Sequence, residues 1–167
     1  MVENLRVTRD YDGTSIPLIT DNTEWSNLTT PAYCWYNNDE TTYKNTFGAL
    51  YNSFSISSGK LCPSGWHVPT KVEWETLEVY LGGWESAGYQ LKDYKLGGNN
   101  SSSFSAQMGG QRYYDGRFEW NTNFGYWWLA TEYVPGSFWS VWMYILYYHT
   151  DFSFGKESGY SVRCIKD

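Results

Sequence analysis

The segment that decides the fold reads LCPSGWHVPTKVEWETL and spans residues 61–77. Its second half predicts the start of a helix, because Thr70 and Glu73 can form a capping box, in which each side chain accepts the other's backbone N–H. Apolar side chains then recur at helical spacing at Trp74, Leu77 and Leu81. Gly82-Gly83 ends the pattern, since glycine adopts the left-handed conformation of a helix C-terminus without steric cost. We therefore expect a helix over residues 70–81.

The chain on either side of this helix reads as strands and loops. Residues 47–56 carry apolar side chains at period two, which predicts a half-buried strand. A weaker helical turn is expected over 86–92, and Asp115-Gly116 predicts a hairpin turn whose two positions take positive φ. Further strands are expected at 111–114, 117–120, 124–131, 138–148 and 160–165. The predicted class is α+β, with a β-rich C-terminal half.

The composition limits the function classes. The 167 residues include 10 Trp, 16 Tyr and 8 Phe, and they carry a net charge of -6. An acidic chain without a basic cluster lacks the electrostatic footprint of nucleic-acid binding, so we expect no nucleic-acid partner. No apolar run approaches the roughly 20 residues of a membrane span, so we expect no membrane insertion by this domain. The length suits a single domain over residues 1–167.

The common motifs of catalytic and metal-binding sites are absent from the sequence. His67 and His149 lie far apart in the sequence and have no H-E-x-x-H spacing. Asn37–Glu40 offers oxygen ligands but not the alternate spacing of a calcium loop, so an ordinary turn is the better interpretation. No C-x-x-C pair occurs among the three cysteines, Cys34, Cys62 and Cys164. We expect no catalytic residue, no metal site and no cofactor.

Cys62 and Cys164 form a natural pair to consider, one before the expected helix and one in the last expected strand. A disulfide between them would close a loop of about 100 residues and contribute on the order of 4 to 5 kcal/mol in an oxidising compartment. Two buried thiols in one core are the alternative, and the sequence leaves both open. Cys34 is left over in either case.

Motifs along nearly the whole chain resemble one family. They are VENLR at 2–6, NND at 37–39, YKNTFGALYN at 43–52, LCPSGWHVP at 61–69, EW at 73–74, YLGG at 80–83, GYWW at 125–128, TE at 131–132 and SVRC at 161–164. With them the chain resembles the Fibrobacter succinogenes major paralogous domain. The resemblance implies a C-type lectin-like fold, in which the termini pair in a sheet, two helices flank small antiparallel sheets, and long loops connect them.

The resemblance also implies which activities to expect. Calcium-dependent lectins use Glu-Pro-Asn or Gln-Pro-Asp followed by Trp-Asn-Asp, whereas this chain has Trp139-Ser140-Val141, so that kind of sugar binding is not implied. The formylglycine-generating branch of the fold requires a pair of active cysteines, and only Cys164 lies in the C-terminal half. We therefore expect a non-enzymatic domain on the outside of a cell, or on a phage or virion surface. Its first residues have no signal-peptide pattern, so a signal or anchor is expected outside this sequence.

The resemblance extends to the variable proteins of diversity-generating retroelements, in which mutated adenines turn AAC codons into NNC codons. Such codons never encode Trp, Met, Glu, Gln or Lys, so Trp139, Trp142 and Met143 would be fixed scaffold. The C-terminal part, 111–167, would then carry the variable ligand surface. The residues expected to bind the ligand are Tyr133, Val134, Ser137, Phe138, Ser140, Tyr144, Tyr148, His149, Thr150, Asp151, Phe152, Ser153 and Phe154.

The residues themselves give this region two interpretations. From Phe118 to Gly155 the chain has no Lys or Arg, and aromatic residues mix with Ser, Thr, His and Asp. That mixture is typical of a recognition surface for a protein or carbohydrate ligand, because Tyr and Trp offer wide contact area at low entropic cost. In the other interpretation the aromatic residues fill a broad core, and the domain is a structural surface or adhesin-tip module. Exposed, contiguous side chains at Tyr144, Tyr148, His149, Phe152 and Phe154 would favour recognition.

Overall fold

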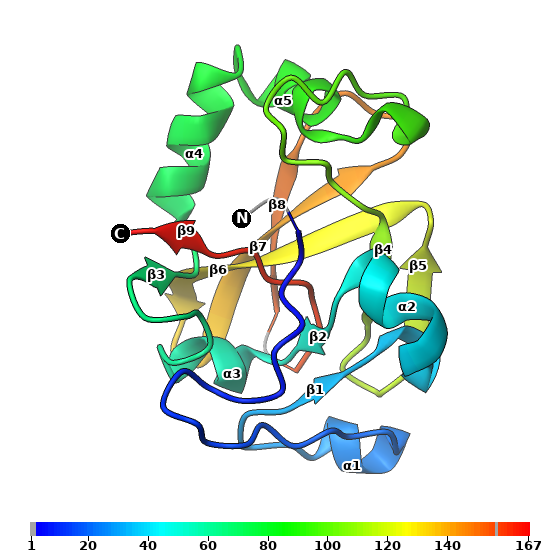
Figure 1. Ribbon diagram of the computed structural model, residues 1–167, viewed down its shortest axis with the longest axis vertical. Helices are drawn as coiled ribbons and strands as arrows, with labels where there is room; N and C mark the ends of the chain where they lie inside the picture. The colour runs from blue at the N-terminus through cyan, green and yellow to red at the C-terminus, as the bar shows by residue number, and fades with distance from the viewer. Residues whose placement is uncertain (1–2, 156) are drawn as a thin grey trace.

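The computed structural model describes residues 3–155 and 157–167, and its class is α+β (Figure 1). Its largest element is a five-stranded sheet in the order β5-β4-β6-β7-β8. The strands are β4 (Gly109–Arg112), β5 (Phe118–Asn121), β6 (Phe124–Val134), β7 (Ser137–Tyr144) and β8 (Asp151–Gly155). Neighbouring strands are antiparallel except β4 and β6, which are parallel. Two small antiparallel sheets pair β1 (Tyr33–Cys34) with β2 (Leu50–Tyr51), and β3 (Trp66–His67) with β9 (Ile165–Lys166).

Helices surround the sheet in greater number than the two expected. They are α1 (Asn22–Ser26), α2 (Glu40–Phe47), α3 (Ser53–Ser57), α4 (Lys71–Tyr80) and α5 (Trp84–Leu91), with 3₁₀ turns η1 (Tyr36–Asn38) and η2 (Tyr94–Leu96). Figure 1 shows α4 and α5 at one end of the molecule and α1 at the other. Among the described residues, no helix has the length and apolar character needed to cross a membrane.

Helix α4 confirms the prediction made from the capping box. The Thr70 hydroxyl accepts the backbone N–H of Glu73 at 3.3 Å, and the Glu73 carboxylate accepts the backbone N–H of Thr70 at 2.8 Å. The helix ends at Tyr80, and Gly82 and Gly83 follow with φ of 87° and 98°. The expected turn at 86–92 is part of the longer helix α5.

The strand predicted over 47–56 is wrong except at Leu50–Tyr51. Phe47 ends helix α2, and Ser53–Ser57 form helix α3. The Asn52 side chain accepts the backbone N–H of Ser55 at 3.1 Å and so begins the second helix. Local capping therefore divides a stretch whose apolar spacing alone resembles a strand.

The C-terminal segment 160–165 is likewise not one strand. It forms isolated bridges, with Tyr160 beside Tyr51 and Ser161 beside Trp127, and only Ile165–Lys166 pair regularly, with β3. Every residue from 158 to 164 is buried, because the segment runs between two covering layers. Among the described residues, the two terminal segments meet through a backbone hydrogen bond from Leu5 N–H to the Val162 carbonyl at 2.8 Å and through side-chain bonds of Asn4 with Ser161 and Arg163, rather than as paired strands.

The hairpin turn is longer, and the last long strand is shorter, than expected. In the turn between β4 and β5 only Gly116 has positive φ, and Tyr113 N–H donates to the Arg117 carbonyl at 2.7 Å. The connection is thus longer than a two-residue turn. Strand β7 ends at Tyr144 instead of 148, and residues 145–150 form a loop against α5.

The two faces of the large sheet are covered differently. On one face, α4 and α5 pack with Trp74 and Leu91 against Trp127, Val141 and Met143. On the other, Trp128 and Phe138 of the sheet pack with residues from both ends of the chain, among them Leu5, Tyr160 and Cys164. Cys164 is joined to Cys62 by a disulfide, whereas Cys34 is a buried free thiol. The residues that cover this second face contact Trp128 and Phe138. They leave the other end of the face, near Tyr144, open to side chains from loops.

Candidate ligand-binding surface

Strand β7 divides the sequence-predicted surface between two faces of the sheet. Its residues alternate, so Trp139, Val141 and Met143 face the α4–α5 layer and Trp142 and Tyr144 face the opposite side. Strand β8 follows the same register, with Phe154 opposite Trp139 and Phe152 opposite Val141. The region 133–154 is therefore not one continuous surface.

A chain of aromatic ring contacts begins on the side of Trp142 and Tyr144 and continues through the loop 145–150 to helix α5. Phe124 is 4.6 Å from Tyr144 and 5.7 Å from Trp142, between ring centroids. Tyr147 is 4.9 Å from both Tyr144 and His149. The chain extends to Trp120 beside Phe124 and to Trp84 beside His149. We call this set the aromatic face: Trp84, Trp120, Phe124, Trp142, Tyr144, Tyr147 and His149.

The aromatic face is partly open to solvent. Trp84, Trp120 and Tyr147 are 55%, 50% and 49% exposed, and the others are half-buried. Its rings come from strands β5, β6 and β7, from helix α5 and from the loop 145–150. Rings of this kind bury large apolar areas when a ligand covers them.

The loop 145–150 is held firmly against α5. Lys92, which is fully buried, donates hydrogen bonds from Nζ to the carbonyls of Ile145 at 2.8 Å and Tyr147 at 2.6 Å. Thr150 N–H donates to the Trp84 carbonyl at 3.0 Å, and the Thr150 hydroxyl donates to the Glu78 carboxylate. These bonds fix the positions of Tyr147 and His149 before any ligand arrives.

Four of the thirteen residues predicted to contact a ligand do not lie on the surface. Ser137, Phe138, Ser140 and Thr150 are buried, at 7%, 5%, 0% and 1% exposure. Phe138 belongs to the core beneath the sheet, and the Ser140 hydroxyl is hydrogen-bonded to that of Ser153 at 2.8 Å. The mixture of apolar and polar residues in this region indicates positions that face outward. In the folded protein, segments distant in the sequence cover them.

The other predicted residues fall into separate groups. Tyr144 and His149 belong to the aromatic face. Exposed Tyr148 packs edge-on against Tyr89 at 5.2 Å and lines an open hollow with Glu85 and Ser86. The remainder lie at the end of β6 and along the edge strand β8: Tyr133, Val134, Asp151, Phe152, Ser153 and Phe154.

That edge carries a second cluster of rings. Tyr133 stacks on Phe154 at 4.2 Å and meets Trp139 edge-on at 5.0 Å. The Lys71 ammonium lies 4.4 Å from the ring centroid of Phe152 and 5.3 Å from that of Trp139. Phe152 and Trp139 also pack on the α4–α5 core, so this cluster resembles the rim of a core more than a ligand platform.

Sequence reasoning missed five members of the aromatic face: Trp84, Trp120, Phe124, Trp142 and Tyr147. The codon argument places Trp142 in the scaffold, although its alternation with Val141 and Met143 sets it beside Tyr144. Trp84 comes directly after Gly82-Gly83, which end helix α4, and is the first residue of helix α5. The pattern of expected strands gives no indication of this position. Only the fold brings these segments together.

The titratable groups suit structural roles. Burial raises the pKa of the Cys34 thiol to about 12, although Arg112 opposes the shift. Hydrogen bonds to Asp167 and then Glu73 raise the pKa of His67, whose ring nitrogens lie 2.6 Å and 2.9 Å from those carboxylates. Within residues 3–155 and 157–167, no group of three or more His, Cys, Asp or Glu side chains is arranged to hold a metal ion.

Comparison with known proteins identifies the family. The sequence matches the Fibrobacter succinogenes major domain over residues 1–166. No match was found among curated proteins or among solved structures. Since the match spans nearly the entire chain, the protein belongs to the Fibrobacter succinogenes major domain family.

Proposed function

We propose that this domain is a non-enzymatic recognition module, exposed outside the cell or on a phage or virion, that binds a protein or carbohydrate ligand through its aromatic face. One observation carries the proposal: the continuous row of partly exposed rings from Trp120 through Phe124, Tyr144 and Tyr147 to His149. Monomeric domains rarely expose contiguous apolar surface without a use for it.

The support under these rings favours recognition. Phe124, Trp142 and Tyr144 stand on paired strands, and the Lys92 hydrogen bonds hold the loop that carries Tyr147. A preorganised surface loses little conformational entropy when it binds, so more of its contact energy appears as affinity. Wide aromatic rings suit stacking on sugar rings as well as packing against a protein patch.

A C-type lectin-like fold is part of the proposal. It is supported by the contact between the N-terminal segment and Val162, and by the disulfide that joins Cys164 to the segment before α4. The same disulfide supports a non-enzymatic role, because it occupies Cys164, and the raised pKa of Cys34 disfavours a nucleophilic thiolate. Formylglycine-generating chemistry is therefore the least supported alternative.

Diversification by a retroelement is a separate part of the proposal. It concerns the exposed and half-buried positions between 133 and 154 other than Trp139 and Trp142, which together with buried Met143 would be fixed scaffold. The coding DNA tests this part. We expect a near-copy of the 3′ end of the coding sequence beside a reverse-transcriptase gene, and the two copies should differ only at adenines. A neighbourhood without such a copy would refute diversification and leave ligand recognition intact.

The recognition test uses matched aromatic variants. Trp120→Ala and Tyr147→Ala remove rings of the aromatic face, while Tyr80→Ala and Tyr94→Ala remove exposed rings elsewhere. Each protein is titrated with cellohexaose, xylohexaose and mannohexaose by tryptophan fluorescence, and is screened on an array of purified cell-surface proteins. We expect at least one probe to bind, and each face variant to weaken it about tenfold, since a buried ring contributes about 1.5 kcal/mol or more.

The control variants should leave that affinity unchanged. Equal losses in Tyr80→Ala and Tyr147→Ala would contradict the assignment to the aromatic face. Absence of binding to every probe would favour the alternative, a structural surface or adhesin-tip domain without a dedicated ligand.

A further inference from the structure

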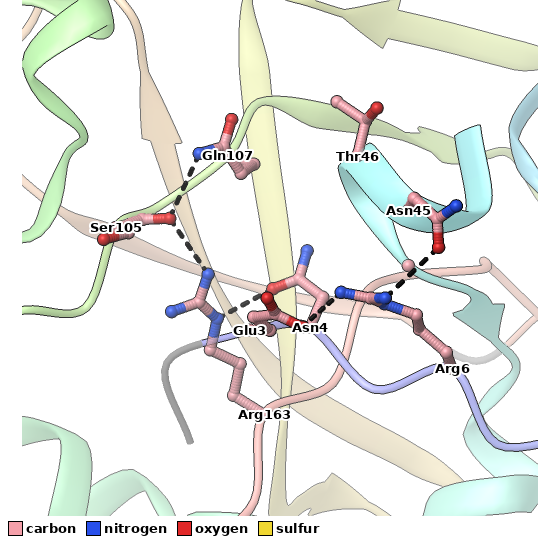
Figure 2. A pocket seen from close by; sticks show the side chains of 9 residues that line it. Glu3, Asn4, Arg6, Asn45, Thr46, Ser105, Gln107 and Arg163 are labelled. Atoms are coloured by element: carbon pink, nitrogen blue, oxygen red, sulfur yellow. Dashed lines mark hydrogen bonds and ion pairs between the residues drawn. The ribbon is translucent and has the colours of Figure 1, made fainter. Parts of the chain in front are cut away.

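A cavity of about 280 Å³ lies between four segments that are distant in the sequence. Its lining comes from the N-terminal segment, the end of helix α2, the segment before β4 and the C-terminal segment. Figure 2 shows the guanidinium groups of Arg163 and Arg6 on either side of Asn4 and Glu3, with polar side chains along the other walls. These polar side chains are Asn45, Thr46, Ser105 and Gln107. The cavity shares no residue with the aromatic face, so a ligand bound in it would be independent of the proposed function.

Arg163 forms the floor of this cavity. The residue is only 4% exposed, and its guanidinium lies 3.9 Å from the ring centroid of Phe104. Nε donates to Asn4 Oδ1 at 2.8 Å, and the terminal nitrogens donate to the backbone carbonyls of Phe104 and Ser105. These partners are neutral, and within the part of the chain that the structure describes no carboxylate forms an ion pair with Arg163.

Asn4 keeps this guanidinium in place. Its Oδ1 also accepts the indole N–H of Trp127 at 2.9 Å, and its Nδ2 donates to the carbonyl of Phe47 at 2.7 Å. Both the position of Arg163 and the end of α2 are thus fixed by one buried amide. The floor of the cavity is a positive centre, and burial lowers the pKa of Arg163 to about 9 because it desolvates the guanidinium, while the Glu3 carboxylate opposes the shift.

A buried cation without a carboxylate is not enough to identify a binding site, as Arg112 demonstrates. Arg112 is fully buried, its guanidinium lies over Trp25 and Phe118, and its nitrogens donate to four backbone carbonyls and to Asn22. Five bonds saturate that guanidinium in a closed setting. Arg163 differs because it makes three such bonds to described residues and borders an open cavity.

The cavity holds a second cation. Arg6 donates to Asn45 Oδ1 at 3.3 Å and forms an ion pair with Glu3, whose side chain is 69% exposed. With two arginines and one glutamate, the lining carries a net positive charge on a protein whose net charge is -6. This local positive charge favours an anionic group inside the cavity.

We propose that this cavity binds a small carboxylate that also carries hydroxyl groups, such as a hexuronate, with the carboxylate against the guanidinium groups of Arg163 and Arg6. Planar guanidinium groups match the two oxygens of a carboxylate, and the amides of Asn45 and Gln107 and the hydroxyl of Thr46 can bind hydroxyl groups. The volume is at the lower end of small-molecule sites, which suits a molecule of monosaccharide size.

The test titrates the protein with sodium glucuronate, with glucose and with inorganic phosphate, followed by calorimetry and by NMR of the arginine side chains. Glucuronate is expected to bind and to shift the Arg163 Nε–H signal, and its affinity should fall as salt rises. Glucose keeps the hydroxyl groups without the carboxylate and is expected not to bind. Phosphate supplies an anion without the hydroxyl groups and is expected to bind more weakly than glucuronate.

The test uses variants of residues at the mouth of the cavity, so that a change in affinity does not arise from a failure to fold. Arg6→Gln should weaken glucuronate about tenfold, because it removes a charge-assisted hydrogen bond. Glu3→Gln should tighten it about threefold, because it removes a like charge. Arg9→Gln and Glu40→Gln make the same charge changes outside the cavity and should leave the affinity unchanged.

Four outcomes would overturn the proposal. They are no binding of glucuronate, equal binding of glucose, binding of phosphate as tight as that of glucuronate, and equal effects of Arg6→Gln and Arg9→Gln. Failure at the aromatic face would leave these expectations unchanged.

Discussion

The ammonium group of Lys92 donates a 2.6 Å hydrogen bond to the backbone carbonyl of Tyr147. Together with the bond to Ile145, this contact joins the end of helix α5 to the loop that presents Tyr147 and His149. Burial lowers the pKa of Lys92, since desolvation disfavours its charge. A buried cation thus takes the place of regular strand pairing beyond Tyr144, where β7 ends.

Lys92→Met is expected to loosen this loop. The change keeps most of the apolar stem but leaves two carbonyls without a donor, which should cost about 2–4 kcal/mol of unfolding free energy. Urea denaturation measures that loss, and hydrogen exchange should rise over residues 145–148. Exposed Lys95→Met serves as the control and should change neither quantity. Unchanged exchange in Lys92→Met would show that the loop is held by other contacts.

Gly88→Ala should destabilise the protein, against the usual preference of helices for alanine. A Cβ at this position would lie 2.6 Å from the carbonyl oxygen of His149 and 2.8 Å from that of Tyr148. The overlap should cost about 1–3 kcal/mol, whereas relief of glycine's flexibility alone would add about 1 kcal/mol of stability. Thermal and urea unfolding show whether the free energy of unfolding falls or rises in Gly88→Ala. Glu85→Ala, exposed on the same helix, should stay within about 0.5 kcal/mol of wild type, and a more stable Gly88→Ala would refute the close contact.

The disulfide between Cys62 and Cys164 should contribute strongly to stability. It joins residues separated by 102 positions, and closing a loop of that length is worth about 4 to 5 kcal/mol in the chain-entropy model. Urea denaturation with and without a phosphine reductant measures the difference. The double variant Cys62→Ala/Cys164→Ala should match the reduced protein and should not respond to reductant. A response in the double variant would point to some other reducible group.

His67 should titrate above its ordinary pKa, because Asp167 and then Glu73 stabilise its charged form. A raised pKa in the folded state gives a stabilising contribution that is complete below about pH 6.5, the unfolded value, and is lost as pH rises through the folded pKa. Asp167→Asn should lower the His67 pKa, as measured by NMR of the imidazole ring. It should also flatten the fall in melting temperature as pH rises through the folded pKa. Asp151→Asn, an exposed site on β8, should do neither; an unchanged His67 pKa in Asp167→Asn would remove the role of that carboxylate.

Parts of the fold could be predicted because they depend on neighbours in the sequence. The capping box at Thr70 and Glu73 and the glycines at 82 and 83 act within a few residues, and helix α4 has the predicted position. The same local chemistry explains an error, because apolar spacing alone predicts a strand over 47–56, whereas the cap at Asn52 starts a helix there. Both results follow from interactions shorter than one helical turn.

The candidate sites could be predicted only in part. The sequence indicated an aromatic surface in the C-terminal region, and Tyr144 and His149 do lie on it. Burial of Ser140 and Thr150, by contrast, depends on Ser153 and on Glu78, which reach them only through the sheet and helix α4. The cavity around Arg163 had no signal in the sequence, because no two of its four segments are close in the chain.

The sequence by itself determined the α+β class, the family and the position of its capped helix, because patterning and capping operate over short distances. The tertiary structure alone decided which aromatic rings are open. Trp128 and Phe138 are covered by segments from both ends of the chain, while Trp142 and Tyr144, on the same side of β7 and β6, are not. Alternation along a strand assigns a residue to a face, but only packing against remote segments decides whether that face is core or surface.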